Sequence, residues 1–182
     1  MRAFLGVSVN DALKPRITQV LDALDHFDVK QVEPKNLHFN LRFFSYISPD
    51  DAENLKDIVS GISRRHSSFE VELYGVGAFP SKNIARVLWL GVRDGYEKFK
   101  SFGDDIENSV SHALGLEKEK EFRPHMTLGR VRSGSNSNEL LVFLRKYENI
   151  EIGRMRIDKI TLFKSLLEPK GPKYEEVFSI KI

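Results

Sequence analysis

The apolar residues along the chain follow two different periods, one typical of strands and one typical of helices. Residues 2–9 (RAFLGVSV) are almost continuously apolar and predict a mostly buried strand. Residues 11–25 instead carry apolar side chains three and four positions apart, which indicates the buried face of a helix with Pro15 in its early turns. Pro34 then marks a turn before a second strand at about 37–44.

The same two patterns continue through the middle of the chain. The stretch SPDDAENLKDIVSGISRR predicts a helix, because Ser48 can cap it and the acidic residues of its first turn complement the helix dipole. FEVELYGVGAFP and ARVLWLGV predict two strands joined by a short loop, and we expect them to be antiparallel neighbours. Residues 95–114 predict a further helix, which stops at Gly115.

The last third of the chain predicts a strand at 124–131, a polar loop (SGSNSN) and a helix at 139–148 capped by Ser137 or Asn138. Strands follow in EIGRMRIDKITLFKSLL and YEEVFSIKI, separated by the turn EPKGPK. The order is strand, helix, strand, helix, two strands, and then helix, strand, helix, two strands. This order predicts an α+β chain in two similar halves.

Composition narrows the class of protein. The 182 residues, 41% hydrophobic and 30% charged, suit one globular domain or two small lobes that share a core. A formal net charge of +2 neither demands nor excludes nucleic acid, and the lack of cysteine excludes disulfides, thiolate catalysis and cysteine-ligated zinc. The first apolar run is too short for a signal peptide, and none approaches the roughly 20 residues of a membrane span. We therefore expect a cytoplasmic protein that does not bind membranes.

Two short stretches of the chain share one arrangement of polar residues. LHFNLRF at 37–43 and PHMTLGR at 124–130 each carry a histidine at the same place. Because alternate residues of a strand project from one face, His38 and Asn40 point one way, as do His125 and Thr127. If the two halves pack about a pseudo-twofold axis, the histidines face each other across one cleft.

Such a histidine pair suits displacement at the phosphorus of a 2′,3′-cyclic phosphate. One neutral imidazole takes a proton from water, while the other, as imidazolium, gives a proton to the departing sugar oxygen on the opposite side of phosphorus. A histidine pKa near 6.5 makes both forms available. Asn40 and Thr127 can donate hydrogen bonds to the phosphate oxygens, and Arg130 can offset their charge. No metal or other cofactor is required.

Other candidate residues near these motifs carry weaker signals. Strict alternation sends Arg130 and Arg132 to the face opposite His125, unless a bulge or a strand end turns Arg130 back. We expect Arg42 and Arg132 on the solvated surface. Among the aromatic residues, Phe79 is the best candidate for stacking a nucleobase, because the sequence places it beside a proline in a loop.

The stretches EPKNLHFNL and FRPHMTLGR resemble the paired H-x-T-x motifs of the two-histidine phosphoesterase superfamily. MRAFLGV and ARVLWLGV resemble its RNA 2′,3′-cyclic phosphodiesterase branch, also called 2′-5′ RNA ligase, and the resemblance extends along essentially the whole chain. It implies a single bilobal domain over 1–182, with two pseudo-symmetric α+β lobes, each an antiparallel sheet with helices, around a central cleft. It also implies a metal-independent reaction in which His38 is the proton donor and His125 the proton acceptor. Spacing alone assigns neither role.

The resemblance predicts an enzyme that hydrolyses terminal RNA 2′,3′-cyclic phosphates to 2′-phosphomonoesters, with 2′-5′ RNA ligase activity on the same groups. The expected partners are RNA ends such as tRNA halves, bound by a monomer. Asn40 departs from the motif, because threonine is expected there. The alternative is therefore a module that binds RNA ends or cyclic nucleotides with weakened catalysis. A purely structural histidine pair would leave the duplicated polar faces without a purpose.

Overall fold

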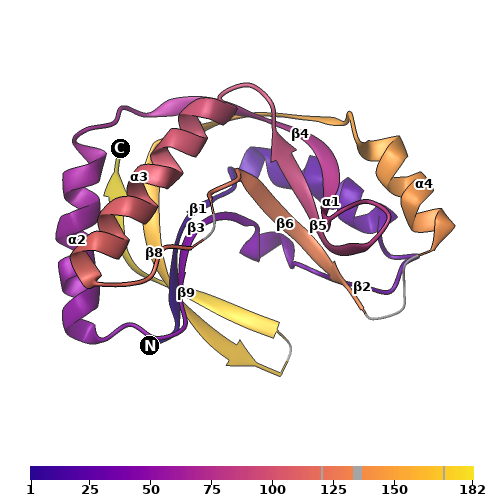
Figure 1. Ribbon diagram of the computed structural model, residues 1–182. Helices are drawn as coiled ribbons and strands as arrows, with labels where there is room; N and C mark the ends of the chain where they lie inside the picture. Colours follow the sequence, from indigo (N-terminus) through magenta and orange to yellow (C-terminus); the bar gives the residue numbers. More distant parts are fainter. Residues whose placement is uncertain (120, 133–136, 170) are drawn as a thin grey trace.

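The computed structural model describes residues 1–119, 121–132, 137–169 and 171–182 (Figure 1). Its strands are β1 (Ala3–Ser8), β2 (Val29–Gln31), β3 (His38–Phe44), β4 (Phe69–Pro80), β5 (Ala85–Val92), β6 (His125–Val131), β7 (Glu151–Ile157), β8 (Lys159–Glu168) and β9 (Gly171–Lys181). Its α-helices are α1 (Lys14–Ala23), α2 (Pro49–Ser63), α3 (Tyr96–Leu114) and α4 (Asn138–Tyr147), with short 3-10 helices η1 (Asp11–Leu13) and η2 (Pro34–Asn36). The predicted polar loop and the turn EPKGPK lie partly outside the described residues, at 133–136 and 170.

Local signals set the ends of the helices as predicted. Ser48 caps α2, because its Oγ accepts a hydrogen bond from the Asp51 N–H at 3.0 Å. Ser137 caps α4 in the same way, through the Leu140 N–H at 3.1 Å. Gly115 ends α3 with a positive φ of 61°, a conformation that glycine adopts without strain. These boundaries follow from the residues nearest to them.

The first helix differs from its prediction. A continuous helix was expected over 11–25, but the segment begins as the 3-10 helix η1, and α1 starts only at Lys14. Pro15 accounts for part of this difference, because it has no N–H to donate to the carbonyl of Asp11, and that carbonyl accepts the Lys14 N–H in a 3-10 turn instead. The Asn10 side chain caps the 3-10 turn instead, through the Ala12 N–H at 3.0 Å.

All described strands join one antiparallel sheet in the order β7-β4-β5-β6-β3-β1-β8-β9, with β2 paired to β6. This order is symmetric about the β6–β3 pair, since each inner strand is followed outward by three others. We name the two sides by their helices. The α2–α3 lobe contains β3, β1, β8 and β9, and the α1–α4 lobe contains β6, β5, β4 and β7 (Figure 1). The predicted α+β fold with two pseudo-symmetric lobes is confirmed.

The lobes are not the two halves of the sequence. Strands β8 and β9, at the C-terminal end, complete the sheet of β1 and β3, so both termini lie in the α2–α3 lobe (Figure 1). Conversely, α1 lies on the α1–α4 lobe, where the Arg16 Nε donates a hydrogen bond to the Glu151 carbonyl at 2.8 Å. The chain therefore crosses between the lobes, and one continuous cluster of buried apolar side chains runs through both.

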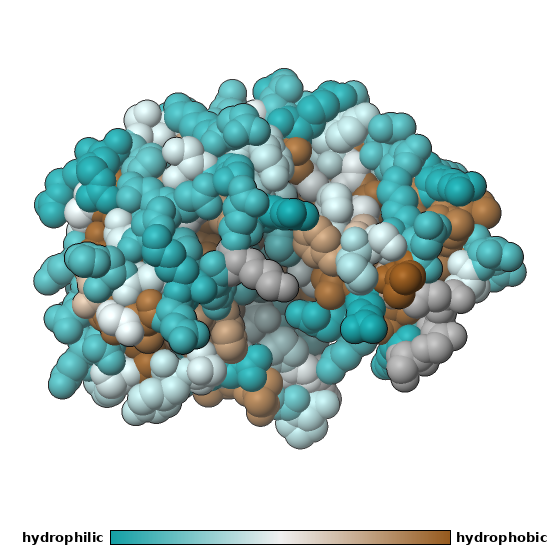
Figure 2. All heavy atoms as spheres, in the orientation of Figure 1, coloured by the Kyte–Doolittle hydropathy of each residue, from teal (hydrophilic) through white to brown (hydrophobic). Residues whose placement is uncertain are grey.

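Outside this core, the solvent-facing surface of the molecule is mostly polar. Hydrophilic side chains cover most of the face shown in Figure 2, and hydrophobic ones appear in patches between them. No helix within the described residues is long and apolar enough to cross a membrane.

Candidate active site

The inner strands of the two lobes bring the duplicated motifs side by side. Strands β3 and β6 are antiparallel, with Phe39 directly opposite Met126. One residue to either side of this pair, the antiparallel register puts His38 across from Thr127 and puts Asn40 across from His125. Phe39 and Met126 are fully buried, so their neighbours project from the other face, away from the core. The four predicted polar side chains therefore share one face at the symmetry axis.

The two imidazoles are held in the same way. The Nδ1 atom of His38 donates a hydrogen bond to the Asn36 carbonyl at 2.6 Å, and the Nδ1 atom of His125 donates to the Arg123 carbonyl at 2.6 Å. Because a carbonyl can only accept, each Nδ1 carries the hydrogen in the neutral ring. Each Nε2 atom then holds the free lone pair. This tautomer is the one needed for proton transfer at Nε2.

Burial lowers the pKa of both histidines. For His38 the hydrogen bond to the Asn36 carbonyl acts in the opposite direction, and the charge of the nearby His125 lowers the pKa further. For His125 the lowering by burial is opposed by the hydrogen bond to the Arg123 carbonyl. Both rings are therefore neutral in the free protein at neutral pH. The effect of the His125 charge on the pKa of His38 indicates that the two rings lie near each other.

Both inner strands carry a β-bulge at the same place. In β3, Leu5 and Gly6 of β1 face Arg42 and Asn40, which leaves Leu41 as the extra residue. In β6, Leu88 and Trp89 of β5 face Gly129 and Thr127, which leaves Leu128 as the extra residue. Each bulge lies three residues after its histidine. It reverses the alternation of every residue that follows in that strand.

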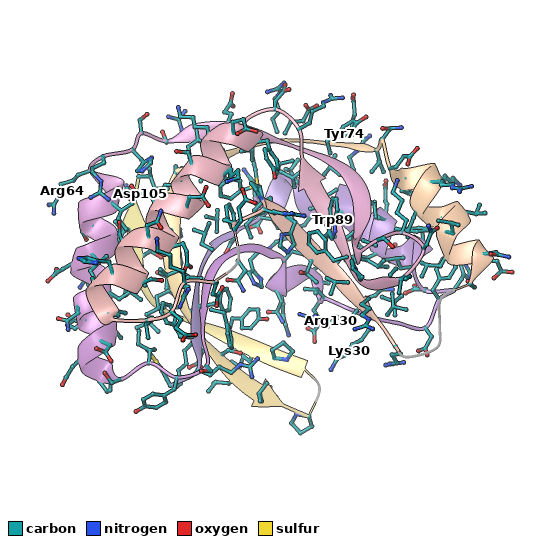
Figure 3. The ribbon with its side chains drawn as sticks, viewed as in Figure 1. Lys30, Arg64, Tyr74, Trp89, Asp105 and Arg130 are labelled. Carbon is teal, nitrogen blue, oxygen red and sulfur yellow. The ribbon has the colours of Figure 1, made fainter. Side chains whose placement is uncertain are left out.

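The bulge in β6 changes the predicted position of Arg130. Simple alternation put Arg130 opposite His125, but the bulge returns it to the face of Thr127, where it is exposed. Its positive charge also acts on Tyr174 of the other lobe. Burial raises the pKa of Tyr174, and the charges of Arg2 and Arg130 act to lower it. Arg130 lies beside Lys30, its partner on β2 (Figure 3). The structure thus places a basic pair at this edge of the site.

The bulge in β3 has the opposite effect on Arg42. The expectation that Arg42 is solvated is wrong, because only 6% of this residue is exposed and it forms an ion pair with Glu107 of α3. Its Nη2 donates a hydrogen bond to the Glu117 carbonyl at 2.9 Å, and Glu107 accepts another from the Glu119 N–H at 2.8 Å. This buried cluster holds Glu117 and Glu119, which follow α3, close to that helix. Arg132, by contrast, is exposed as expected and pairs with Asp28 at 2.8 Å.

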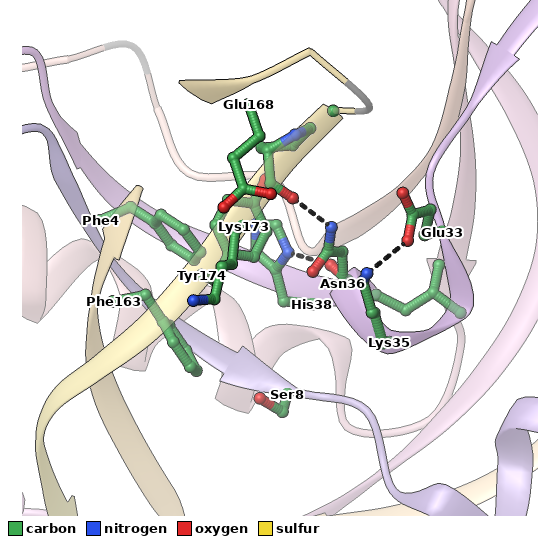
Figure 4. A pocket seen from close by; sticks show the side chains of 13 residues that line it. Phe4, Ser8, Glu33, Lys35, Asn36, His38, Phe163, Glu168, Lys173 and Tyr174 are labelled. Atoms are coloured by element: carbon green, nitrogen blue, oxygen red, sulfur yellow. Dashed lines mark hydrogen bonds and ion pairs between the residues drawn. The ribbon is translucent and has the colours of Figure 1, made fainter. Parts of the chain in front are cut away.

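Aromatic side chains surround His38 in a cavity of about 510 Å³ (Figure 4). The ring of Phe4 stacks on His38 with centroids 4.4 Å apart, and Tyr174 meets the same imidazole edge-on at 5.4 Å. Phe163 lies beside Phe4, with centroids 5.1 Å apart. Asn36 closes one side, because its Nδ2 donates a hydrogen bond to the Pro172 carbonyl at 2.8 Å.

Sequence reasoning missed Phe163 and Tyr174. Both lie on the last two strands, more than 120 positions after His38 in the chain. The pairing of Phe4 with Phe163 brings β8 to the site, and the pairing of Ser165 with Tyr174 brings β9. The sequence predicts strands that carry these aromatic residues. It does not predict that the first of them pairs with β1, which is what brings both residues to His38.

His125 lines a second cavity, of about 550 Å³. The ring of Phe79 meets His125 edge-on at 5.0 Å and lies 5.2 Å from the ring of Trp89. Phe79 was predicted in a loop, but it belongs to β4, where it pairs with Val87. A side chain at Gly77 would collide with the indole of Trp89, so this glycine gives the indole room to lie against β4.

The two rings were expected to face each other across one cleft. They lie on one face of the β3–β6 pair, and each imidazole lines its own cavity. The aromatic neighbours are Phe4 and Tyr174 for His38 and Phe79 for His125. Among the described residues, no group of three or more His, Asp or Glu side chains is placed to hold a metal ion. The expectation of a metal-free reaction stays a prediction.

Comparison with known proteins agrees with this arrangement. The sequence profile of the 2′-5′ RNA ligase superfamily matches residues 6–167. A protein of Methanothermobacter thermautotrophicus named RNA 2′,3′-cyclic phosphodiesterase is 34% identical over 182 residues, which cover 97% of this chain and 96% of that protein.

Solved structures show the same fold at lower identity. The crystal structure of TT0787 of Thermus thermophilus superposes with a TM-score of 0.83 at 22% identity, covering 100% of this chain and 97% of that one. Escherichia coli LigT complexed with 3′-AMP superposes with a TM-score of 0.79 at 17% identity, covering 100% and 97%. From the profile match and the identity to the archaeal relative, this chain belongs to the 2′-5′ RNA ligase superfamily.

Proposed function

We propose that this protein hydrolyses the terminal 2′,3′-cyclic phosphate of RNA to a 2′-phosphomonoester. The observation that carries the proposal is the quartet of His38, Asn40, His125 and Thr127 on one face of the β3–β6 pair. Both imidazoles are oriented alike, with Nε2 free for proton transfer. The archaeal relative named RNA 2′,3′-cyclic phosphodiesterase supports the same reaction.

The reaction follows from this quartet when the roles of the family are carried over to its two histidines. The neutral His125 takes a proton from water, whose oxygen attacks phosphorus. The bond from phosphorus to O3′ breaks, and the imidazolium of His38 gives its proton to O3′. The negative phosphate favours this imidazolium and offsets the lowering of its pKa by burial. Thr127, Asn40 and Arg130 donate hydrogen bonds to the non-bridging oxygens.

The proposal extends to the setting of the reaction. The substrate is an RNA end such as that of a tRNA half, and the binding of 3′-AMP by E. coli LigT supports a nucleotide at this site. Residues 1–182 act as one bilobal domain, as a monomer and in the cytoplasm. No metal takes part. A 5′-hydroxyl in place of water gives 2′-5′ ligation on the same groups.

Turnover of a 2′,3′-cyclic nucleotide in EDTA tests the hydrolase. We expect His38→Ala and His125→Ala each to lose at least about 100-fold in kcat, the usual contribution of general acid–base catalysis. His112→Ala is the matched control, because His112 is an exposed histidine on α3 outside both cavities. Activity that survives either of the first two substitutions, or that disappears in EDTA, would contradict the mechanism.

The alternative is a binding module for RNA ends. Asn40 favours it, because this longer planar amide occupies an exposed position across from His125, where the family motif has threonine. Tight binding of a cyclic nucleotide with no turnover in the unmodified protein would support the module. Turnover that both alanine substitutions abolish would support the enzyme.

A further inference from the structure

The cavity beside His125 is much larger than hydrolysis requires. A water molecule occupies about 30 Å³, whereas this cavity holds about 550 Å³, in the range of sites for small organic ligands. We propose that it binds the 5′-terminal nucleoside of a second RNA strand, the acceptor in 2′-5′ ligation. This inference rests on the proposed function, because it uses the same histidine pair and the same cyclic phosphate.

The position of the cavity follows the geometry of the reaction. The attacking and leaving oxygens must lie on opposite sides of phosphorus. His38, the proton donor to the leaving O3′, lines the cavity closed by Phe4 and Tyr174, so the sugar of the cyclic phosphate belongs on that side. His125, the proton acceptor, lines the other cavity. A nucleophile that enters beside His125 therefore comes from the second cavity.

The walls of the second cavity suit a nucleoside. Phe79 and Trp89, with ring centroids 5.2 Å apart, provide aromatic faces next to His125, and Tyr96 at the start of α3 adds a third ring. Nucleobases stack on such rings with little preference for sequence. Gly77 and Gly91 leave space for the indole, since a side chain at either position would press on it.

A positive charge at the mouth fits the next phosphate of the acceptor strand. Arg123 lines the cavity, its side chain is exposed, and no carboxylate pairs with it in the part of the chain that the structure describes. Lys82, also in the lining, is already paired with Glu148. Arg123 is therefore the cation available for an acceptor phosphate. The carbonyl of Arg123 also accepts the hydrogen bond from His125. The same residue therefore contacts both the acceptor strand and the histidine that takes its proton.

The transfer balances without another reactant. The 5′-hydroxyl of the acceptor gives its proton to Nε2 of His125, and its oxygen forms the new bond to phosphorus. The bond from phosphorus to O3′ breaks, and O3′ takes the proton of His38. One phosphoester bond forms as one breaks, so no nucleoside triphosphate is consumed. The product carries a 2′-5′ linkage and a free 3′-hydroxyl.

Saturation separates a bound acceptor from a chance collision. With a 2′,3′-cyclic nucleotide as donor and adenosine as acceptor, the dinucleotide should form at a rate that saturates with adenosine, while hydrolysis falls as adenosine displaces water. 5′-Deoxyadenosine, which has no 5′-hydroxyl, should slow hydrolysis over a similar concentration range and give no dinucleotide. A transfer rate that rises linearly with adenosine, with no effect of 5′-deoxyadenosine, would overturn the acceptor site.

A rim substitution locates the acceptor. Ser81 is exposed and lines the cavity, so Ser81→Trp should fill its mouth and lower the ratio of transfer to hydrolysis by about tenfold, in keeping with the loss of one stacked base. Asn83→Trp is the matched control, because Asn83 lies on the same turn outside the cavity, and it should leave the ratio unchanged. Equal ratios in the two variants would overturn the site. Absence of hydrolysis in the unmodified protein would instead overturn the proposed function.

Discussion

Burial of His38 and His125 determines how activity should depend on pH. The pKa of each is below the ordinary 6.5, and a positive charge on His125 lowers that of His38 further. Above both pKa values the pair has no imidazolium to donate a proton, and below both it has no neutral ring to accept one. The kcat/KM profile of the free enzyme should therefore be bell-shaped with its maximum below pH 6.5. Initial rates at low cyclic nucleotide concentration measure it, and a maximum above pH 7 would show that burial does not control the pair.

Asn40 is the residue at which this chain departs from its family motif. Asn40 lies across from His125 in the β3–β6 pair. In the same way, Thr127 lies across from His38. A rotatable hydroxyl can follow a phosphate oxygen through the reaction, whereas the amide is longer and planar. We expect Asn40→Thr to keep or raise kcat/KM, by up to about tenfold, the worth of one good hydrogen bond to a charged group. A steep loss of activity in this variant would show that the amide itself is required.

At the scale of elements, features that depend on neighbouring residues, such as helix caps, could be predicted from the sequence. Features that depend on the pairing of distant strands could not. The caps at Ser48 and Gly115 could be predicted, because each acts within a few residues of its own helix. Strict alternation placed His38 and His125 on the polar face, and it failed after Leu128, because a bulge depends on the partner strand. The burial of Arg42 could not be predicted for the same reason. Its partner Glu107 lies 65 residues away on α3.

The ion pair between Arg42 and Glu107 should carry a large share of stability. Removal of the arginine would leave a buried carboxylate that still accepts hydrogen bonds from Ser111 and the Glu119 N–H but has lost its counter-charge. We expect Arg42→Ala to lower the free energy of unfolding by about 3–5 kcal/mol, the usual cost of breaking a buried pair. Urea unfolding measures this loss.

The exposed pair between Arg132 and Asp28 supplies the control for that measurement. Both of its side chains are at least half exposed, so Arg132→Ala should change the free energy of unfolding by only about 0–1 kcal/mol. A similar small loss in Arg42→Ala would mean that water reaches Glu107. The attachment of the segment before the second motif to α3 would then need another explanation.

For the whole molecule, the crossing of the chain between lobes predicts that they unfold together. β1 is held between β3 and β8, so neither half of the sequence contains a complete lobe, and the apolar core is continuous. Trp89, the single tryptophan, reports on the α1–α4 lobe, and its fluorescence midpoint in urea should coincide with the midpoint from far-ultraviolet circular dichroism. Phe163→Trp in a Trp89→Phe background moves the reporter to the α2–α3 lobe, and fluorescence and circular dichroism should again coincide.

Separate midpoints in either protein would mean that the lobes are independent domains. The two histidines would then depend on a contact between lobes that can open, because β3 and β6 meet in register only at Phe39 and Met126.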